Sequence, residues 1–188
     1  TVHNIGNAGY TKCSSDRMCG LPNQSIETWQ SNLQTALSLP IKHLSAYHLT
    51  YEEGTKMYQL RQQAVSEDTS YLMFQTLHQY IEEAGMEAYE ISNFAYPGYR
   101  SKHNSRYWQN KPYLGIGAAA HSYNGSNKRR WNVSDLTKYI NGITQNNANF
   151  EDELLSDDDL YNELIITSLR TIEGINLAHI KPNYLPYF

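Results

Sequence analysis

The stretch SSDRMCGLPNQSIETWQSNLQTAL, residues 14–37, decides the fold, because it reads as a strand, a turn and a helix in that order. The strand is expected from Ser14 to Leu21, ending in a turn at Gly20-Leu21-Pro22-Asn23. Ser25 is placed to cap the helix, since a serine hydroxyl accepts a hydrogen bond from the free amides of a first helical turn. The apolar residues that follow recur at helical spacing: Ile26, Trp29, Leu33, Ala36 and Leu37. The stretch therefore predicts one βα unit.

Two further segments continue this alternation of strand and helix. A strand is expected from His43 to Thr50 and another from Met86 to Ile91. Between them, Ser66 is placed to cap a helix that ends at Gly85. This order is typical of an α/β fold with a parallel sheet, in which ligands bind at the carboxyl ends of the strands. Those ends are Gly20-Leu21-Pro22, Thr50 to Gly54, and Ser92-Asn93.

The alternation stops after the third strand. Residues 95–132 are predicted to form a long loop, and their aromatic side chains indicate that it is ordered. A helix capped by Ser134 and a helix from Ser156 to Gly174 are expected to follow. Asp157-Asp158-Asp159 reads as a solvated first turn of the last helix, where the helix dipole favours anions. We therefore expect three parts: residues 1–94, 95–150 and 151–188.

Charge is unevenly distributed along the 188 residues, whose net charge is −4. Residues 151–188 carry two Lys or Arg and eight Asp or Glu, and are acidic. Residues 91–134 contain no Asp or Glu, and hold seven cations: Arg100, Lys102, Arg106, Lys111, Lys128, Arg129 and Arg130. Cations interleaved with aromatic residues suit a planar anionic partner, such as a tetrapyrrole with propionates, a nucleotide or single-stranded nucleic acid. The acidic end disfavours nucleic acid.

Several classes of protein are not supported by the sequence. No stretch approaches the roughly 20 apolar residues of a membrane span, and no signal peptide is visible. The first residues suggest that the chain begins within a longer protein. Cys13 and Cys19 match no zinc or iron-sulfur spacing, so we interpret them as packing thiols in a reducing cytoplasm.

Two histidines in the acid-free segment are candidates for iron ligation or proton transfer, namely His103 and His121. If the segment around His103 is helical, then Arg106, Tyr107 and Trp108 border one pocket with it. The remaining histidines are interpreted as structural: His3, His43, His48, His78 and His179. Gly115-Ile116-Gly117 allows close backbone approach but lacks the context of a dinucleotide fingerprint.

Five segments, taken in order, resemble a known family. They are Gly20-Leu21-Pro22-Asn23-Gln24, His43 to Tyr47, Tyr89 to Ala95, His103 to Trp108, and Tyr113 through Ser122. Together they are similar to the radical-SAM, oxygen-independent coproporphyrinogen III oxidase-like family, and specifically to its haem-chaperone branch, HemW. The H-N-x-x-Y-W element is the most specific, because the oxidases do not share it.

This resemblance implies a fold and a set of cofactors. The expected fold is the C-terminal half of a partial (β/α)6 TIM-like barrel, an irregular loop region, and the start of a helical winged-helix-like domain. The family binds S-adenosyl-L-methionine and a 4Fe-4S cluster, and by position Asp16, Thr50 and His121 would contact S-adenosylmethionine. Haem would contact five residues, with His103 on the iron: His103, Asn104, Arg106, Tyr107 and Trp108.

The family's C-x-x-x-C-x-x-C motif is absent from the printed residues. We therefore do not expect this chain to hold the cluster or to be enzymatically active by itself. Arg17, within the first predicted strand, would also need a partner if that strand is buried in a barrel.

The predicted function is that of a cytoplasmic haem-binding chaperone, with haem or another porphyrin as ligand. Oxidative decarboxylation of coproporphyrinogen III is the alternative, and a nucleic-acid-binding module is a third. The resemblance also admits haem-receiving proteins and a second copy of the chain as partners.

Overall fold

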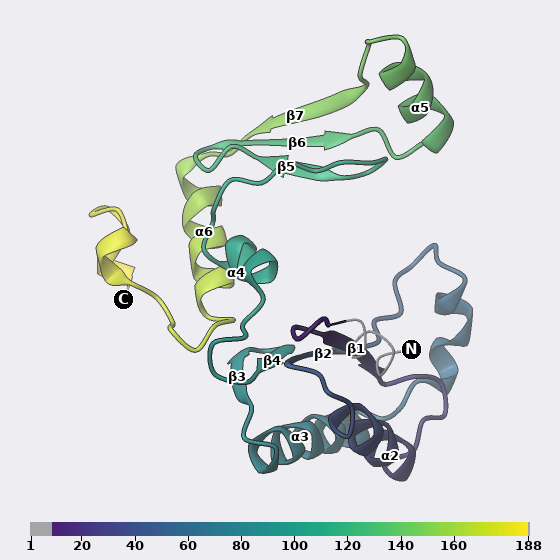
Figure 1. Ribbon diagram of the computed structural model, residues 1–188. Helices are drawn as coiled ribbons and strands as arrows, with labels where there is room; N and C mark the ends of the chain where they lie inside the picture. The colour runs from purple at the N-terminus through teal and green to yellow at the C-terminus, as the bar shows by residue number, and fades with distance from the viewer. Residues whose placement is uncertain (1–8, 188) are drawn as a thin grey trace. The chain divides into compact units, whose positions relative to one another are not determined.

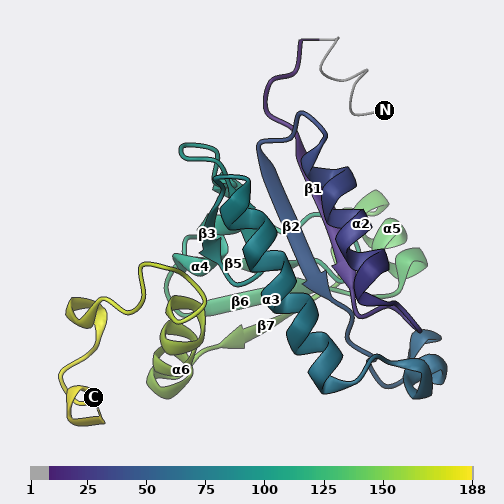
Figure 2. The same cartoon turned by 90° about the horizontal axis from the view of Figure 1, so that it is seen from below.

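The computed structural model describes residues 9–187 and divides into two compact units, residues 1–101 and 102–188. The boundary falls seven residues after the predicted end of the first part at residue 94. The boundary predicted between residues 150 and 151 falls within a strand, β7 (Phe150–Leu154). The two units are shown in Figures 1 and 2, and each is described by itself.

The first unit contains a four-stranded sheet in the order β1-β2-β4-β3. Its strands are β1 (Ser14–Cys19), β2 (His43–His48), β3 (Glu87–Glu90) and β4 (Asn93–Ala95). β1 and β2 are parallel, as predicted. β4 was not predicted, and it lies between β2 and β3, antiparallel to both. The expectation of a purely parallel sheet is therefore wrong, because a three-residue strand after a tight turn gives too short a pattern to recognise.

Two helices, α2 (Ile26–Leu37) and α3 (Glu67–Glu83), cover one face of this sheet (Figure 2). Both predicted caps are confirmed, since the hydroxyls of Ser25 and Ser66 accept from the amides of Thr28 and Thr69. A short 3-10 helix, η1 (Met57–Gln63), precedes α3.

The hydrophobic core lies between these helices and the sheet. Its fully buried side chains include Trp29, Leu33, Leu44, Met73 and Phe94. Burial of each such side chain contributes roughly 1.5–3 kcal/mol. The indole nitrogen of Trp29 also donates to the carbonyl of Met73 at 3.0 Å, which ties α2 to α3. Packing and one buried hydrogen bond thus fix both helices on the sheet.

The second unit contains a three-stranded antiparallel sheet in the order β5-β6-β7. Its elements are α4 (Lys102–Trp108), β5 (His121–Tyr123), β6 (Lys128–Asn132), α5 (Leu136–Thr144), β7 and α6 (Asp157–Ser168), followed by η2 (Leu177–His179) and η3 (Leu185–Tyr187). α5 and α6 lie at opposite ends of this sheet (Figure 1).

Several local predictions for the second unit need correction. Residues 95–132 are not one loop, because they contain α4, β5 and β6. α5 is capped by Asp135 and not by Ser134, since the Asp135 carboxylate accepts from the amide of Lys138 at 2.9 Å. The last helix ends at Ser168 and does not reach Gly174.

The start of the last helix is as predicted. Ser156 and Asp159 form a reciprocal capping box, in which the Ser156 hydroxyl accepts from the Asp159 amide and the Asp159 carboxylate accepts from the Ser156 amide. The acidic run therefore serves the helix terminus.

His78 makes the stability of the first unit depend on pH. Its ring lies 4.3 Å from that of Phe74 and 5.6 Å from that of Phe94, and burial lowers its pKa. Since the unfolded chain binds this proton more tightly, the free energy of unfolding should fall as pH drops below about 6.5. We predict that His78→Leu reduces this fall, as measured by urea denaturation at about pH 7.5 and 5.5. An unchanged fall would show that His78 does not contribute.

Candidate functional site

α4 places His103 and Tyr107 on one helical face, because residues four apart are neighbours on a helix. Their rings meet edge to face with centroids 5.1 Å apart. The Tyr107 hydroxyl lies 3.3 Å from Nε2 of His103, within hydrogen-bonding distance. The His103 imidazole is exposed to solvent. The helical arrangement that was a condition of the sequence prediction is therefore present.

The ring of Tyr107 continues into a row of aromatic side chains. Tyr113 lies 4.7 Å from Tyr107, and Tyr123 lies 6.2 Å from Tyr113, measured between ring centroids. The backbones of Tyr113 and Tyr123 pair as an isolated antiparallel bridge, and Tyr123 is buried. We call His103, Tyr107, Tyr113 and Tyr123 the aromatic row. It extends from an exposed imidazole to a buried phenol on β5.

The other predicted members of this site make different contacts. The Trp108 ring lies under the Arg170 guanidinium at 4.6 Å, and its indole nitrogen has no hydrogen-bond partner among residues 9–187. Arg106 donates to the carbonyl of Pro112 at 3.3 Å. Asn104 is half-buried on α4. The structure thus joins His103 and Tyr107 directly, while Trp108 contacts Arg170, which follows α6.

Four of the seven cations of the acid-free segment are neutralised by carboxylates from outside it. Arg100 pairs with Glu87 at 2.7 Å, and Arg129 pairs with Glu163 at 2.8 Å. Lys128 and Arg130 share Asp152 at 2.7 Å and 2.6 Å. Hydrogen bonds from Arg130 and then Lys128 hold the pKa of Asp152 well below its usual range.

Of the seven cations of the acid-free segment, three have no carboxylate partner within residues 9–187: Lys102, Arg106 and Lys111. All three lie on α4 or just after it. The positive charge of residues 91–134 that no carboxylate neutralises is therefore concentrated beside the aromatic row.

His121, on β5, is exposed, and its ring stacks on that of Trp131 with centroids 5.7 Å apart and planes at 28°. Gly115 presses against the same residue, since a Cβ on Gly115 would lie 2.1 Å from the His121 carbonyl oxygen. The Gly115 amide also donates to the Ser122 hydroxyl at 2.9 Å. The glycine of the G-x-G run thus serves backbone packing against β5.

Asp16 and Thr50 lie in the first unit, whereas His121 lies in the second. Asp16 is exposed on β1, and Thr50 is exposed two residues after β2. Arg17, the neighbour of Asp16, is half-buried and donates to the Asp16 carbonyl at 3.0 Å. The free-energy cost of burying the Arg17 charge is therefore reduced, because its side chain retains access to water.

The first unit also contains a polar cluster that the sequence reasoning missed. It lies on the sheet face opposite α2 and α3, and its buried members include His43, Ser45, Glu90 and Asn93. The Glu90 carboxylate accepts from the Asn93 side chain at 2.5 Å and from the Ser92 amide at 3.0 Å. Burial lowers the pKa of His43, and the Asp16 charge opposes that shift.

His43 was interpreted as having no functional company, and the structure shows it in contact with Ser14 and Tyr89. The sequence offered one signal for this cluster: His43 and Ser45 alternate with the apolar Leu44 and Ala46 along β2. Of the other histidines interpreted as structural, His3 lies outside the described residues.

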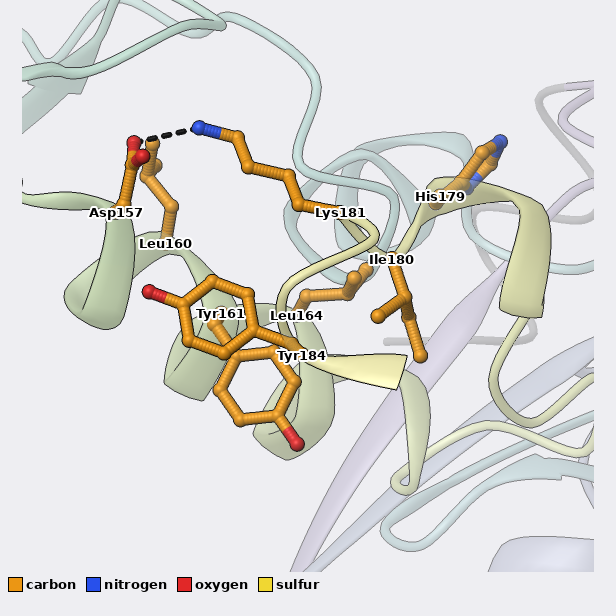
Figure 3. Close-up of a pocket in the computed structure, with 8 residues that line it drawn as sticks. All are labelled: Asp157, Leu160, Tyr161, Leu164, His179, Ile180, Lys181 and Tyr184. Carbon is orange, nitrogen blue, oxygen red and sulfur yellow. Dashed lines mark hydrogen bonds and ion pairs between the residues drawn. The ribbon is translucent and has the colours of Figure 1, made fainter. Parts of the chain in front are cut away.

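A small hollow in the second unit lies between α6 and residues 179–184 (Figure 3). Figure 3 shows Tyr161 and Tyr184 stacked, with Lys181 reaching Asp157. A hydrogen bond to Asp158 raises the pKa of Tyr184 to about 12. The hollow measures about 60 Å³, whereas pockets for drug-sized ligands measure roughly 300–1,000 Å³. It is therefore too small for a porphyrin.

Across residues 9–187, no group of three or more His, Cys, Asp or Glu side chains is arranged to hold a metal ion. In that same part of the chain, the helices are too short or too polar to cross a membrane. Cys13 and Cys19 are both free thiols.

Comparison with protein-family models gives no match. Individual proteins are nevertheless similar to this chain in sequence. The chain is 34% identical over 182 residues to the heme chaperone HemW of Bacillus subtilis, covering 94% of this chain and 48% of that protein. It is 29% identical to the heme chaperone HemW of Lactococcus lactis, covering 93% of this chain and 47% of that protein. The chain thus spans about half the length of these relatives.

Two further similarities agree with these. Over 114 residues the chain is 43% identical to the mouse radical S-adenosyl methionine domain-containing protein 1, mitochondrial, covering 58% of this chain and 26% of that protein. Among solved structures, coproporphyrinogen III oxidase (HemN) from Escherichia coli, a radical-SAM enzyme, matches with a TM-score of 0.72. That match has 17% identity and covers 90% of this chain and 43% of the other, so it shows the mixed α/β fold alone.

The contact between Gly115 and β5 yields a test of the second unit. Gly115→Ala would place a methyl group against the His121 carbonyl, and overpacking of this kind costs about 1–3 kcal/mol. Ser122→Ala, the matched control, removes only the hydrogen bond to the Gly115 amide and should cost about 1 kcal/mol. Urea denaturation of both variants measures the difference. A Gly115→Ala variant as stable as the parent would contradict this packing.

Proposed function

Because the chain belongs to the HemW family of radical-SAM, coproporphyrinogen III oxidase-like proteins, we propose that it binds haem at α4 as part of a haem chaperone. The two bacterial relatives are named heme chaperones, and the chain matches them over more than nine-tenths of its length. What the chain itself contributes is a surface on which haem could lie.

The observation that carries this proposal is the position of the unpaired cations. Lys102 and Arg106 are one helical turn apart on α4, next to the row that begins with His103 and Tyr107. Lys111 follows three residues after the end of α4. A haem offers two propionates and a flat apolar macrocycle, so cations beside stacked aromatic rings match both of its parts.

His103 is the proposed iron ligand. Its imidazole is exposed, and a neutral ring nitrogen is a common axial ligand of haem iron. The Tyr107 hydroxyl can fix the ring orientation through the contact with Nε2, as hydrogen-bond partners do for metal-bound histidines. Asn104 and Trp108 remain proposed haem contacts, with Trp108 stiffening α4 through Arg170.

Two further cofactors follow from the family. The resemblance assigns Asp16, Thr50 and His121 to S-adenosylmethionine, which supplies an organic radical when it is reduced; Asp16 and Thr50 belong to the first unit and His121 to the second. The Asp16 carboxylate is exposed and suits hydroxyl or ammonium donors, so this residue fits such a ligand. For a 4Fe-4S cluster the residues present do not fit, because the chain has only two cysteines, of which Cys13 precedes β1 and Cys19 is its last residue.

We extend the proposal to the finer architecture. The first unit would be the C-terminal half of a partial (β/α)6 barrel, and the second the loop region and the start of a winged-helix-like domain. The parallel β1–β2 pair, with α2 between the strands in sequence, supports the first assignment.

Two alternatives receive less support. The hypothesis of coproporphyrinogen III oxidation is supported by a solved structure that is 17% identical to this chain. The relatives that are 34% and 29% identical are named heme chaperones. Nucleic-acid binding is weakened because Lys128, Arg129 and Arg130 are neutralised by Asp152 and Glu163. A location in the cytoplasm, haem-receiving proteins and a homodimer remain predictions from the resemblance.

A titration with two porphyrins tests the proposal. We predict that haem shifts its Soret band on binding the chain, and that His103→Ala weakens haem binding but leaves binding of iron-free protoporphyrin unchanged, because only haem has an axial ligand to lose. Lys102→Gln and Arg106→Gln should each weaken the binding of both porphyrins by about 1.4- to fivefold, because an exposed ion pair contributes roughly 0.2–1 kcal/mol.

His179→Ala and Lys138→Gln are the controls, since each removes an exposed residue of the same type elsewhere in the second unit. Both should bind haem like the parent. Equal haem affinity in the parent and in His103→Ala would remove His103 as the ligand. Absence of any Soret shift in the parent would reject haem binding by this chain.

A further inference from the structure

The sheet of the second unit has one edge that no strand of the described chain covers. The outer edge of β5 is occupied by Tyr113, whose backbone exchanges two hydrogen bonds with that of Tyr123, at 3.0 and 2.9 Å. β7 lies at the other edge of the sheet (Figure 1) and pairs with β6 over five residues without a register shift. On its outer side, no strand within residues 9–187 pairs with it. The outer edge of β7 is therefore a row of backbone groups that can pair with an added strand.

The register shows which backbone groups of β7 point outward. On either side of β7, Leu155 donates its amide to the carbonyl of Asn127 at 2.8 Å, and Asn149 accepts from the amide of Val133 at 3.1 Å. Because hydrogen bonding alternates along an antiparallel pair, every second residue between Asn149 and Leu155 bonds to β6. The residues of β7 whose amides and carbonyls point away from β6 are therefore Phe150, Asp152 and Leu154.

The side chains of β7 divide between the two faces of the sheet. Glu151 and Glu153 share one face, because side chains alternate along a strand. Both are exposed, and neither forms an ion pair within residues 9–187. On the other face, Asp152 is neutralised from β6, whereas Phe150 is 42% exposed and Leu154 is 73% exposed. An added strand that fits both faces needs cations opposite the two glutamates and apolar side chains opposite Phe150 and Leu154.

We propose that the outer edge of β7 binds an extended segment of a partner protein, in which two Lys or Arg residues, separated by one residue, are flanked by apolar side chains. β6 already binds the inner edge with this chemistry, since Lys128 and Arg130, one residue apart, pair with Asp152. The acidic side chains disfavour a second copy of this chain, because antiparallel pairing of β7 with itself places Glu151 opposite Glu153. The surface does not depend on haem binding.

A blocked peptide, Val-Lys-Thr-Lys-Val, tests this surface by hydrogen exchange in the ¹⁵N-labelled chain. The peptide reads the same in both directions, so its lysines meet the two glutamates in either orientation. At saturation, exchange should slow about two- to tenfold at the outward amides of Phe150, Asp152 and Leu154, as expected for one added hydrogen bond each. The amides of Glu151 and Glu153, which already bond to β6, should not change. This alternation distinguishes strand addition from a contact made through charge alone.

Variants of the two glutamates test the selection by charge. Glu151→Gln combined with Glu153→Gln should weaken peptide binding about two- to thirtyfold, because two cross-strand ion pairs are lost. Glu151→Lys combined with Glu153→Lys should lose this peptide and bind Val-Glu-Thr-Glu-Val, which the parent should not bind. Glu173→Gln is the matched control, since it removes an exposed carboxylate that does not belong to β7, and it should bind like the parent. Circular dichroism checks that each variant is folded.

Three results would overturn the proposal. They are the absence of slowed exchange on β7 at millimolar peptide, equal slowing at all five residues of β7, and unchanged affinity in the folded double Gln variant. Slowed exchange at the outward amides without peptide, rising with the concentration of the parent chain, would show that a second copy occupies this edge in place of a basic partner.

Discussion

The second unit depends on how two carboxylates are placed against β6. Asp152 receives both Lys128 and Arg130 across the β6–β7 pair, and Glu163 binds Arg129 from α6. Three adjacent cations on one strand would repel one another without these partners. The pairs neutralise β6, while the β6–β7 backbone ladder joins β7 to the sheet. The cations of residues 91–134 that have no carboxylate partner lie on α4 or just after it. The helix α4 is therefore positively charged, whereas the charges on β6 are neutralised.

In the first unit, the two faces of the sheet bury different kinds of side chain. One face is apolar and packs against α2 and α3 through residues such as Leu44 and Phe94. The other face buries His43, Ser45 and Asn93, which is tolerable only because hydrogen bonds satisfy such groups. A buried polar face constrains side-chain orientation more tightly than an apolar one, because each donor needs a particular acceptor.

Local signals predicted much of the fold from sequence. Ser25 and Ser66 were recognisable caps, and helical spacing located α2, α3 and α6, because these features involve residues within one or two turns. β4 and β7 were missed for a different reason. β4 has three residues, and β7 reads Phe-Glu-Asp-Glu-Leu, in which Asp152 pairs with two cations on the neighbouring strand β6. Propensity does not report such partners.

The candidate site was predictable to a similar extent. The spacing of His103 and Tyr107 was sufficient to place them together, since a single helix determines it. Which cations stay unpaired depends on Asp152 and Glu163, distant in sequence, so composition alone suggested a broader cationic surface than the structure has. The most direct measurement is a ¹⁵N NMR map of the chain titrated with iron-free, diamagnetic protoporphyrin. We predict that the shifted amides cluster from Lys102 to Tyr113; shifts centred on the β5–β7 sheet or on the first unit, without shifts in α4, would show that the porphyrin does not bind at α4.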